Sequence, residues 1–527
     1  MTTAGEIFVV TSTGSGHLFP CIELCNHISS RNFKTTLVLT SNLTSSVPSS
    51  FFHHPLLAIA EIAPSSSRGP PMLGSDPSKQ QMGLDLEAHL SRRSGDPDSV
   101  PQLCAIVDFQ MGWTKHIFWK FNIPVISFFT FGACAAAMEW GAWKANAGDM
   151  NPGEFRSISG LPEEMVITYS DIKRRPGGPP RGGGAGPPGS TSVRPPGGAG
   201  GGPKPGEQPP WVPLIEGSIA LMFNTCDDLE RPFIDYMAKA MGMPVWGVGP
   251  LLPEQYWKSV DTLIRDREIR QAKRQTNYTE DEVIQWLDSK PRDSVLYVAF
   301  GSETGPTMEE YPILAEALAD STCPFIWVIQ PGLGGSGSEE GSFTHSLESK
   351  IGDRGLIIRG WAPQLLILSH PSTGGFLSHC GWNSTAEAVG RGVPFVAWPI
   401  RGDQIHNAKL VVNHLKIGYM ALAGDSSEMV KKECILEGIE KLMGDEEMHK
   451  RAAVLRAKFA GGFPGSSGIL LAQKHLEKLK CIHVWLCACF CKIMRSRLEI
   501  FGCQCHLTKA HLVCTVVVMN GFKFPKI

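Results

Sequence analysis

The stretch IFVVTSTGSGHLFPCIELCNHISSRNFKTTLVLT, residues 7–40, decides the fold class. Its opening run at 7–11 is apolar and β-branched, which predicts a short buried strand. A glycine-containing turn follows, then an amphipathic pattern over 20–30 that predicts a helix, and then a second strand at 35–40. A strand, a helix and a further strand in this order form a βαβ unit, which implies a parallel sheet. We therefore expect an α/β fold.

The same alternation continues along the chain. A strand at 104–109 (CAIVDF) and an apolar run at 124–129 extend the first unit, and a second unit opens with SVLYVAFGS at 294–302, followed by a predicted helix over 308–319. The pattern predicts two doubly wound α/β domains that face each other across a cleft. In such sheets ligands bind outside the carboxyl ends of the strands, so functional residues should follow strands directly.

The length of 527 residues suits two domains, which we place at 1–252 and 253–460. Within the first domain, segment 176–210 is composed mainly of Gly and Pro and is predicted to be a disordered insertion. The last residues, 481–527, contain seven of the fifteen cysteines and are predicted to be an atypical, unstructured tail. The other eight cysteines are scattered in apolar surroundings, as is typical of reduced core thiols.

Composition excludes several classes of function. Lys and Arg number 49 against 51 Asp and Glu, so no basic surface is expected to hold nucleic acid. No apolar run reaches the roughly 20 residues that a membrane-spanning helix requires, and the first residues lack the features of a secretory signal. We expect a cytoplasmic protein, and a monomer. A metal site in the tail, with Cys487, Cys489, Cys503, Cys505 and His506 as ligands, is disfavoured because the C-x-C spacings differ from the usual zinc pairs.

The first candidate for chemistry is TGSGHLFP at 13–20, where the first strand ends. Phe19 stands where a dinucleotide-binding motif needs its third glycine, and no acidic residue closes the second strand, so a nicotinamide or flavin cofactor is disfavoured. His17 is either catalytic or structural on this evidence alone. Asp108, at the end of another strand, would orient the imidazole, or would serve only as a turn or helix cap. A hydrolase interpretation lacks its G-x-S-x-G nucleophile.

The segment from Trp361 to Gln404 opens with W-A-P-Q, continues with H-C-G-W-N-S-x-x-E and closes with D-Q. It resembles the signature box of the plant family-1 UDP-dependent glycosyltransferases. The resemblance extends to GSGHLFP, VDFQMGW and VLYVAFGS and covers residues 5 to about 480. It implies two Rossmann-like domains of the GT-B fold. It also implies a closing helix at 461–480 that packs back on the N-terminal domain.

The chemistry of the box agrees with this resemblance. A strand, a turn and a helix that begins near Asn383 and Ser384 would offer a helix N-terminus to a diphosphate, and His379 would add a donor. Because no metal-ligand cluster is present, we expect neither metal nor cofactor. Glu387 would bind the ribose hydroxyls, and the flat face of Trp361 would stack on uracil.

The resemblance assigns further residues to the donor site. Asp403 and Gln404 would bind the hydroxyls of the transferred sugar, and Gln404 implies a preference for glucose. Trp382 would line the pocket, although a packing role is equally open for it. The expected UDP-sugar site comprises Ser302, Trp361, Ala362, Gln364, His379, Trp382, Asn383, Ser384, Glu387, Asp403 and Gln404.

The resemblance also gives the reaction. It implies an inverting transfer of glucose from UDP-glucose to the hydroxyl of a small phenolic or flavonoid-type acceptor of plant secondary metabolism. His17 would be the general base and Asp108 its assistant. Two alternatives stay open: a C-glycosyltransferase that acts on an electron-rich ring with the same donor, and a non-catalytic protein that binds a nucleotide sugar.

Overall fold

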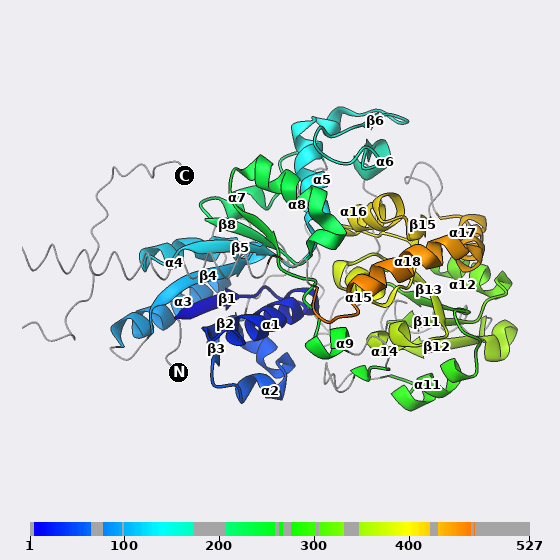
Figure 1. The fold of residues 1–527 in the computed structure, drawn as a ribbon, viewed down its shortest axis with the longest axis horizontal. Helices are drawn as coiled ribbons and strands as arrows, with labels where there is room; N and C mark the ends of the chain where they lie inside the picture. The colour runs from blue at the N-terminus through cyan, green and yellow to red at the C-terminus, as the bar shows by residue number, and fades with distance from the viewer. Residues whose placement is uncertain are drawn as a thin grey trace, which may run out of the picture.

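The computed structural model describes residues 5–64, 77–96, 100–172, 206–258, 263–266, 276–301, 305–330, 347–421, 430–464 and 468. Over these residues the chain forms two α/β halves that lie side by side, the N-terminal half drawn in blue to green and the C-terminal half in green to orange (Figure 1). Each half contains one parallel sheet, as the sequence predicts. No helix in the described ranges is long and apolar enough to cross a membrane.

The N-terminal sheet has the strand order β3-β2-β1-β4-β5-β8-β9, and the pairs are parallel. Its strands are β1 (Glu6–Val10), β2 (Lys34–Thr40), β3 (Leu57–Ile62), β4 (Gln102–Asp108), β5 (Val125–Phe129), β8 (Ala220–Phe223) and β9 (Val245–Gly247). The accompanying helices are α1 (Ser15–Ser29), η1 (Ser41–Ser46), α2 (Ser49–Phe52), α3 (Pro77–Gly95), η2 (Phe109–Thr114), α4 (Lys115–Lys120), α5 (Ala133–Lys144), η3 (Ala147–Asp149), α6 (Tyr169–Ile172), α7 (Val212–Ile215) and α8 (Asp227–Met241). A two-stranded antiparallel sheet, β6 (Phe155–Arg156) with β7 (Ile167–Thr168), lies beside α5 (Figure 1).

The C-terminal sheet has the order β12-β11-β10-β13-β14-β15 and is also parallel. Its strands are β10 (Val295–Ala299), β11 (Phe325–Ile329), β12 (Gly355–Arg359), β13 (Thr373–Ser378), β14 (Phe395–Ala397) and β15 (Gly418–Met420). The helices of this half are α9 (Glu254–Lys258), α11 (Glu280–Asp288), α12 (Glu310–Asp320), η4 (Gly352–Arg354), α14 (Gln364–Ser369), α15 (Trp382–Arg391), α16 (Gln404–Lys409), the π-helical turn η5 (Leu410–His414), α17 (Lys432–Gly444) and α18 (Glu446–Lys458).

Both sheets are buried on both faces because successive side chains of a strand point to opposite sides. Ile7 and Val9 of β1 pack with α1, whereas Phe8 and Val10 pack with α3 and α4 on the other face. The C-terminal sheet repeats this arrangement. Its β10 packs Val295 and the alternate residues against α11, α14 and α15, and the residues between them against α12 and α17.

Two predicted element bounds are wrong in ways that matter for the site. The first helix begins at Ser15 rather than at Pro20, and Pro20 lies inside it. His17 therefore lies in the first turn of α1. Strand β10 ends at Ala299 rather than at Ser302, because Gly301 adopts a φ of +72° that no strand contains.

Several predicted segments fall largely outside the described residues. These are 176–205 of the Gly/Pro-rich insertion, residue 302, and all of the tail at 481–527. Of the predicted closing helix at 461–480, the structure describes 461–464 and 468. Here Phe463 contacts the ring of His27 at 4.2 Å between centroids, and the Gly468 amide donates to the carbonyl of Gly247 at 2.6 Å. The chain thus returns to the N-terminal half after α18.

The eight scattered cysteines are reduced, as predicted, and six of them are buried.

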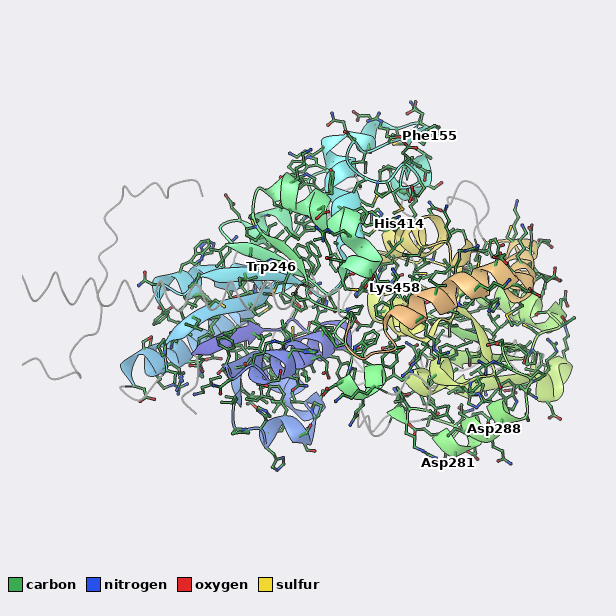
Figure 2. The ribbon with its side chains drawn as sticks, viewed as in Figure 1. Phe155, Trp246, Asp281, Asp288, His414 and Lys458 are labelled. Atoms are coloured by element: carbon green, nitrogen blue, oxygen red, sulfur yellow. The ribbon has the colours of Figure 1, made fainter. Side chains whose placement is uncertain are left out.

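Further contacts join the two halves. Lys458 pairs with Asp228 at 3.1 Å, and His414 contacts Glu164 at 2.8 Å; Figure 2 labels Lys458 and His414 at this interface. A third ion pair, between Lys409 and Asp171, is buried.

Candidate active site

The site lies where the strand order of each sheet reverses. In the N-terminal sheet this point lies between β1 and β4, and in the C-terminal sheet between β10 and β13. His17 follows β1 and Asp108 ends β4, whereas Gly301 follows β10 and His379 follows β13. Such switch points are where open parallel sheets form binding crevices. A cavity of about 640 Å³ is lined by residues from both of them.

His17 and Asp108 meet at this point. Nδ1 of His17 lies 2.6 Å from Oδ2 of Asp108, and the carboxylate is completely buried while the imidazole is 20% exposed on the cavity wall. The other oxygen, Oδ1, accepts a hydrogen bond from the Gln110 amide at 3.0 Å and caps η2. Asp108 is therefore both the partner of the histidine and a helix cap, the two roles that the sequence presented as alternatives.

Thr130 is a third member of this group that the sequence analysis missed. Its Oγ1 lies 3.2 Å from Nδ1 of His17, and its carbonyl accepts a hydrogen bond from the Asn224 side chain at 3.0 Å. Thr130 directly follows β5, the neighbour of β4 in the sheet. The signal was available, because polar residues that follow adjacent parallel strands converge at one sheet edge.

On the opposite side of the cavity, helix α15 begins at Trp382, after the N-cap residue Gly381. This N-cap residue offers no side-chain acceptor, and the first residues of the helix, 382–384, border the cavity. Gly16 of α1 lies close by, because a Cβ there would be 4.0 Å from Nδ2 of Asn383. The starts of α1 and α15 therefore face each other across the gap between the halves.

His379 lies between two glycines, Gly381 in this turn and Gly301 after β10. A Cβ on Gly301 would lie 2.8 Å from its Nε2, and a Cβ on Gly381 would lie 2.4 Å from the same atom. A Cβ at either position would therefore displace the imidazole, and Gly301 also has a φ of +72°, which favours glycine. Cys380, between His379 and Gly381, has a φ of +59°, which is uncommon for a residue with a side chain and is typical of functional turns.

Three predicted donor residues form one hydrogen-bonded cluster. Nε2 of Gln364 donates to Oε2 of Glu387 at 2.7 Å and to Oγ of Ser384 at 3.0 Å. Tyr256 stabilises this cluster, because its hydroxyl donates a hydrogen bond to the backbone carbonyl of Glu387. Tyr256 belongs to α9, and its role was not predicted from the sequence.

Asp403 and Gln404 end the box at the start of α16. Oε1 of Gln404 accepts from the amides of Ile400 and Arg401, each at 3.0 Å, which leaves its Nε2 as the donor for a ligand. Oδ2 of Asp403 accepts from Asn407 at 2.8 Å. Burial raises the pKa of Asp403, and the opposing charge of His17 acts in the other direction. Asp403 and His17 are thus close enough to interact electrostatically across the cavity.

Trp382 connects the two halves. Its indole is 4% exposed, packs with the core of the N-terminal half and donates from Nε1 to the carbonyl of Asn224 at 2.6 Å. It also borders the cavity, so Trp382 both lines the pocket and packs in the core.

Trp361 is half-buried at the cavity wall and Ala362 lies beside it. All the predicted donor residues line the cavity except Ser302, which lies outside the described residues.

The wall next to His17 is aromatic, and its composition was not predicted. Phe19, Phe109, Phe131 and Trp211 border the cavity, with Phe109 and Phe131 in edge-to-face contact at 5.6 Å. This wall offers flat apolar surface to a second ligand. Within the described part of the chain, no group of three or more His, Cys, Asp or Glu side chains is arranged to hold a metal ion.

Comparison with known proteins gives concordant matches. Residues 267–457 match the model of the UDP-glucoronosyl and UDP-glucosyl transferase family. The chain is 40% identical to UDP-glycosyltransferase 73C3 of Arabidopsis thaliana over 49% of this chain and 54% of that relative, so the match spans about half of each. It is 31% identical to scopoletin glucosyltransferase of Nicotiana tabacum over 65% of this chain and 67% of that relative.

Solved structures are similar over a larger share of the chain. A UDP-glucosyltransferase from Polygonum tinctorium, capable of glucosylating indoxyl, superposes with a TM-score of 0.65. The superposition covers 90% of this chain and 98% of the other at 22% identity. This likeness concerns the fold, which is the GT-B arrangement of two Rossmann-like domains.

Proposed function

This chain belongs to the plant family-1 UDP-glycosyltransferases, and from that premise we propose that it transfers glucose from UDP-glucose to a hydroxyl group of a small aromatic acceptor. One observation carries the proposal: a histidine–carboxylate pair in one half faces an uncapped helix N-terminus in the other half across a single cavity. The pair supplies a base, and the helix end supplies an anion site.

His17 acts as the general base. An ionised Asp108 can only accept hydrogen bonds, so Nδ1 of the imidazole carries the proton that lies between them, and Nε2 carries the lone pair. A phenol with a pKa of about 10 is within reach of an imidazole base. When Nε2 takes the proton, Asp108 stabilises the imidazolium that forms.

The leaving group is UDP. Its diphosphate would accept hydrogen bonds from the first amides of α15 and from His379, and these donors stabilise the negative charge that develops as the glycosidic bond breaks. Glu387 would bind the ribose hydroxyls, and Trp361 would stack on uracil. Charge on the leaving group is then neutralised by the protein, without a metal ion.

The sugar lies between Asp403, Gln404 and the base. Gln404 presents an amide donor and Asp403 a carboxylate acceptor, a combination suited to two neighbouring hydroxyls of glucose. Direct attack of the acceptor oxygen on the anomeric carbon, on the face opposite UDP, inverts the configuration and gives a β-glucoside. The acceptor ring would lie against Phe109 and Phe131.

The test combines donor binding with turnover. We expect UDP to bind the folded protein in calorimetry, and mass spectrometry to detect a glucoside when UDP-glucose is supplied with a panel of phenols. His17→Ala should lower kcat/KM by about 10²- to 10⁴-fold, the usual contribution of a general base, and should leave UDP affinity nearly unchanged. Equal turnover by both proteins would refute the base assignment, and absence of UDP binding would refute the proposal as a whole.

C-glycosylation remains an alternative outcome of the same assay, since the base and the donor site would be shared. A glucoside that survives hot acid would identify a carbon–carbon link, because O-glycosides of phenols hydrolyse under those conditions. A protein that binds UDP-glucose tightly but converts none of the phenols would instead support the non-catalytic alternative.

A further inference from the structure

Gln110 is a polar residue on the acceptor side of the cavity, and the proposed reaction does not use its side chain. It directly follows Phe109 of the aromatic wall, borders the cavity itself and is half-buried. Its backbone amide donates to Oδ1 of Asp108 at 3.0 Å. Its side-chain amide takes no part in that contact and points to a separate role.

The orientation of this side-chain amide is set by Ser12. Oγ of Ser12 donates to Oε1 of Gln110 at 2.9 Å, and the backbone amide of Ser12 lies 3.4 Å from Oδ2 of Asp108. Ser12 is 8% exposed and lies just after β1, at the sheet edge that also carries His17. Because Oε1 is occupied by the Ser12 hydroxyl, the other end of the amide is Nε2, which can only donate.

No residue in the described ranges accepts a hydrogen bond from Nε2 of Gln110; the side-chain hydrogen bond of Gln110 there is the one from Ser12 to Oε1. Other polar groups on this wall have partners within the protein. Oγ1 of Thr130 lies 3.2 Å from Nδ1 of His17, and Oε2 of Glu139 accepts from Nε1 of Trp211 at 2.7 Å. A ligand that displaces water from Nε2 must replace the lost hydrogen bond, because a desolvated donor without an acceptor costs free energy.

The Gln110 side chain is tied to the same carboxylate as the base. Asp108 contacts Nδ1 of His17 through Oδ2 and the Gln110 backbone through Oδ1. Gln110 and His17 are thus held at a fixed spacing, and both border the cavity. An acceptor whose hydroxyl meets Nε2 of His17 would bring the substituent beside that hydroxyl toward the Gln110 amide.

We propose that Gln110 selects acceptors that carry an uncharged ether or carbonyl oxygen next to the reacting hydroxyl, by donating a hydrogen bond from Nε2 to that oxygen. Such an oxygen accepts and cannot donate, which matches the donor-only character of Nε2. A hydrocarbon group in the same place would leave Nε2 without an acceptor. This inference rests on the proposed function, because it names the acceptor class of the same site.

The test uses two phenols that differ by an ether oxygen in place of a methylene group. Ortho-methoxyphenol and ortho-ethylphenol have substituents of similar size, and both hydroxyls have a pKa of about 10, so their intrinsic reactivity is similar. Glucoside formation is measured for both with UDP-glucose at neutral pH. We expect kcat/KM for the methoxy compound to exceed that for the ethyl compound by about three- to tenfold, the net contribution of one neutral hydrogen bond.

Two substitutions of Gln110 examine the source of this ratio, and both keep the backbone amide that holds Asp108. Gln110→Leu removes Nε2, so we expect the methoxy-to-ethyl ratio to fall toward unity. Gln110→Glu keeps an oxygen for the Ser12 hydroxyl but replaces Nε2 by a second acceptor, so its ratio should fall below unity. Gln81→Leu is the matched control, since Gln81 is exposed on α3 and does not border the cavity. Its ratio should equal that of the unmodified protein.

Three results would overturn the inference. The first is a methoxy-to-ethyl ratio near unity in the unmodified protein, a result that needs no variant. The second is the same high ratio in both Gln110 variants. The third is loss of turnover with both phenols in Gln110→Leu despite an unchanged melting temperature, which would place Gln110 in the transfer step itself. Failure of the proposed function has a different signature, because the unmodified protein would then form no glucoside with any phenol.

Discussion

At the scale of single residues, the two oxygens of Asp108 have different tasks. Oδ2 holds the imidazole of His17, and Oδ1 holds the backbone of the following turn through the Gln110 amide. The same hydrogen bond that starts η2 therefore keeps the carboxylate pointed at the histidine. Few substitutions of Asp108 could preserve both contacts, because each of its two oxygens has its own partner.

Asp108→Asn separates these tasks. The amide oxygen of Asn can still cap η2, but its NH₂ group would then face Nδ1, which must become the acceptor, so the proton moves to Nε2 and the base is lost. We expect kcat to fall by about 10²-fold or more, with the melting temperature changed by only a few degrees. Turnover and thermal unfolding of the same preparation check this. A large loss of stability with kcat unchanged would contradict it.

At the scale of elements, the glycine-containing turns determine where His17 and His379 lie relative to the starts of α1 and α15. Gly301 and Gly381 lie against His379, and a Cβ at either position would displace the imidazole from its place beside the helix N-terminus. The turn before α1 places His17 in the first turn of that helix. Each half thus presents a histidine and a helix start at its switch point.

Helix α5 has its own N-terminal partner, Glu230, in the kinked start of α8. Its two oxygens accept from the amides of Ala133 and Cys134, each at 2.8 Å. Burial raises the pKa of Glu230 to about 7, from an ordinary value of 4.5, although these hydrogen bonds act in the opposite direction. The folded state therefore holds the Glu230 proton more tightly than the unfolded chain does.

A raised pKa in the folded state means that the stability contributed by this group is fully present below about pH 4.5 and is lost as the pH rises to about 7. Glu230→Gln removes this titration. We expect the melting temperature of the variant, relative to the unmodified protein, to become steadily more favourable between pH 5 and pH 8. Calorimetric scans across this range measure the trend, and a constant or falling difference would contradict the assignment.

At the scale of the whole molecule, Trp382 sets how the halves meet. It starts helix α15 yet is anchored to Asn224 of the N-terminal half, whose side chain holds Thr130 beside His17. Helix α15 and His17 are thereby linked through hydrogen bonds across the interface. UDP itself would contact the C-terminal half alone.

Trp382→Phe keeps an aromatic ring and removes the donor to Asn224. We expect kcat to fall about tenfold because the base and the sugar lose their alignment, while the Kd for UDP changes less than about threefold. Turnover and calorimetry with UDP separate the two effects. If UDP affinity fell and kcat did not, Trp382 would be a donor-site residue and would not set the alignment of the halves.

Much of this architecture could be predicted from the sequence, because hydrophobic period and strand-end residues are local signals. The two parallel sheets follow from such signals, and the strand ends made Asp108 a candidate partner of His17 beside its alternative role as a cap. The box residues were instead assigned by the family resemblance. The contacts of Tyr256, Asn224, Trp211 and Glu139 could not be predicted in this way. Each depends on which elements pack together in three dimensions, and no spacing in the chain encodes it.

Over the residues that the structure describes, the chain passes between the halves near residue 253 and again after α18, where Phe463 and Gly468 reach the N-terminal half. Two connections restrain the relative motion of two bodies more than one connection does. Rotation about the line that joins them is the motion that they restrain least. We therefore expect an opening that admits a nucleotide to be a bending of the halves that separates His17 from His379.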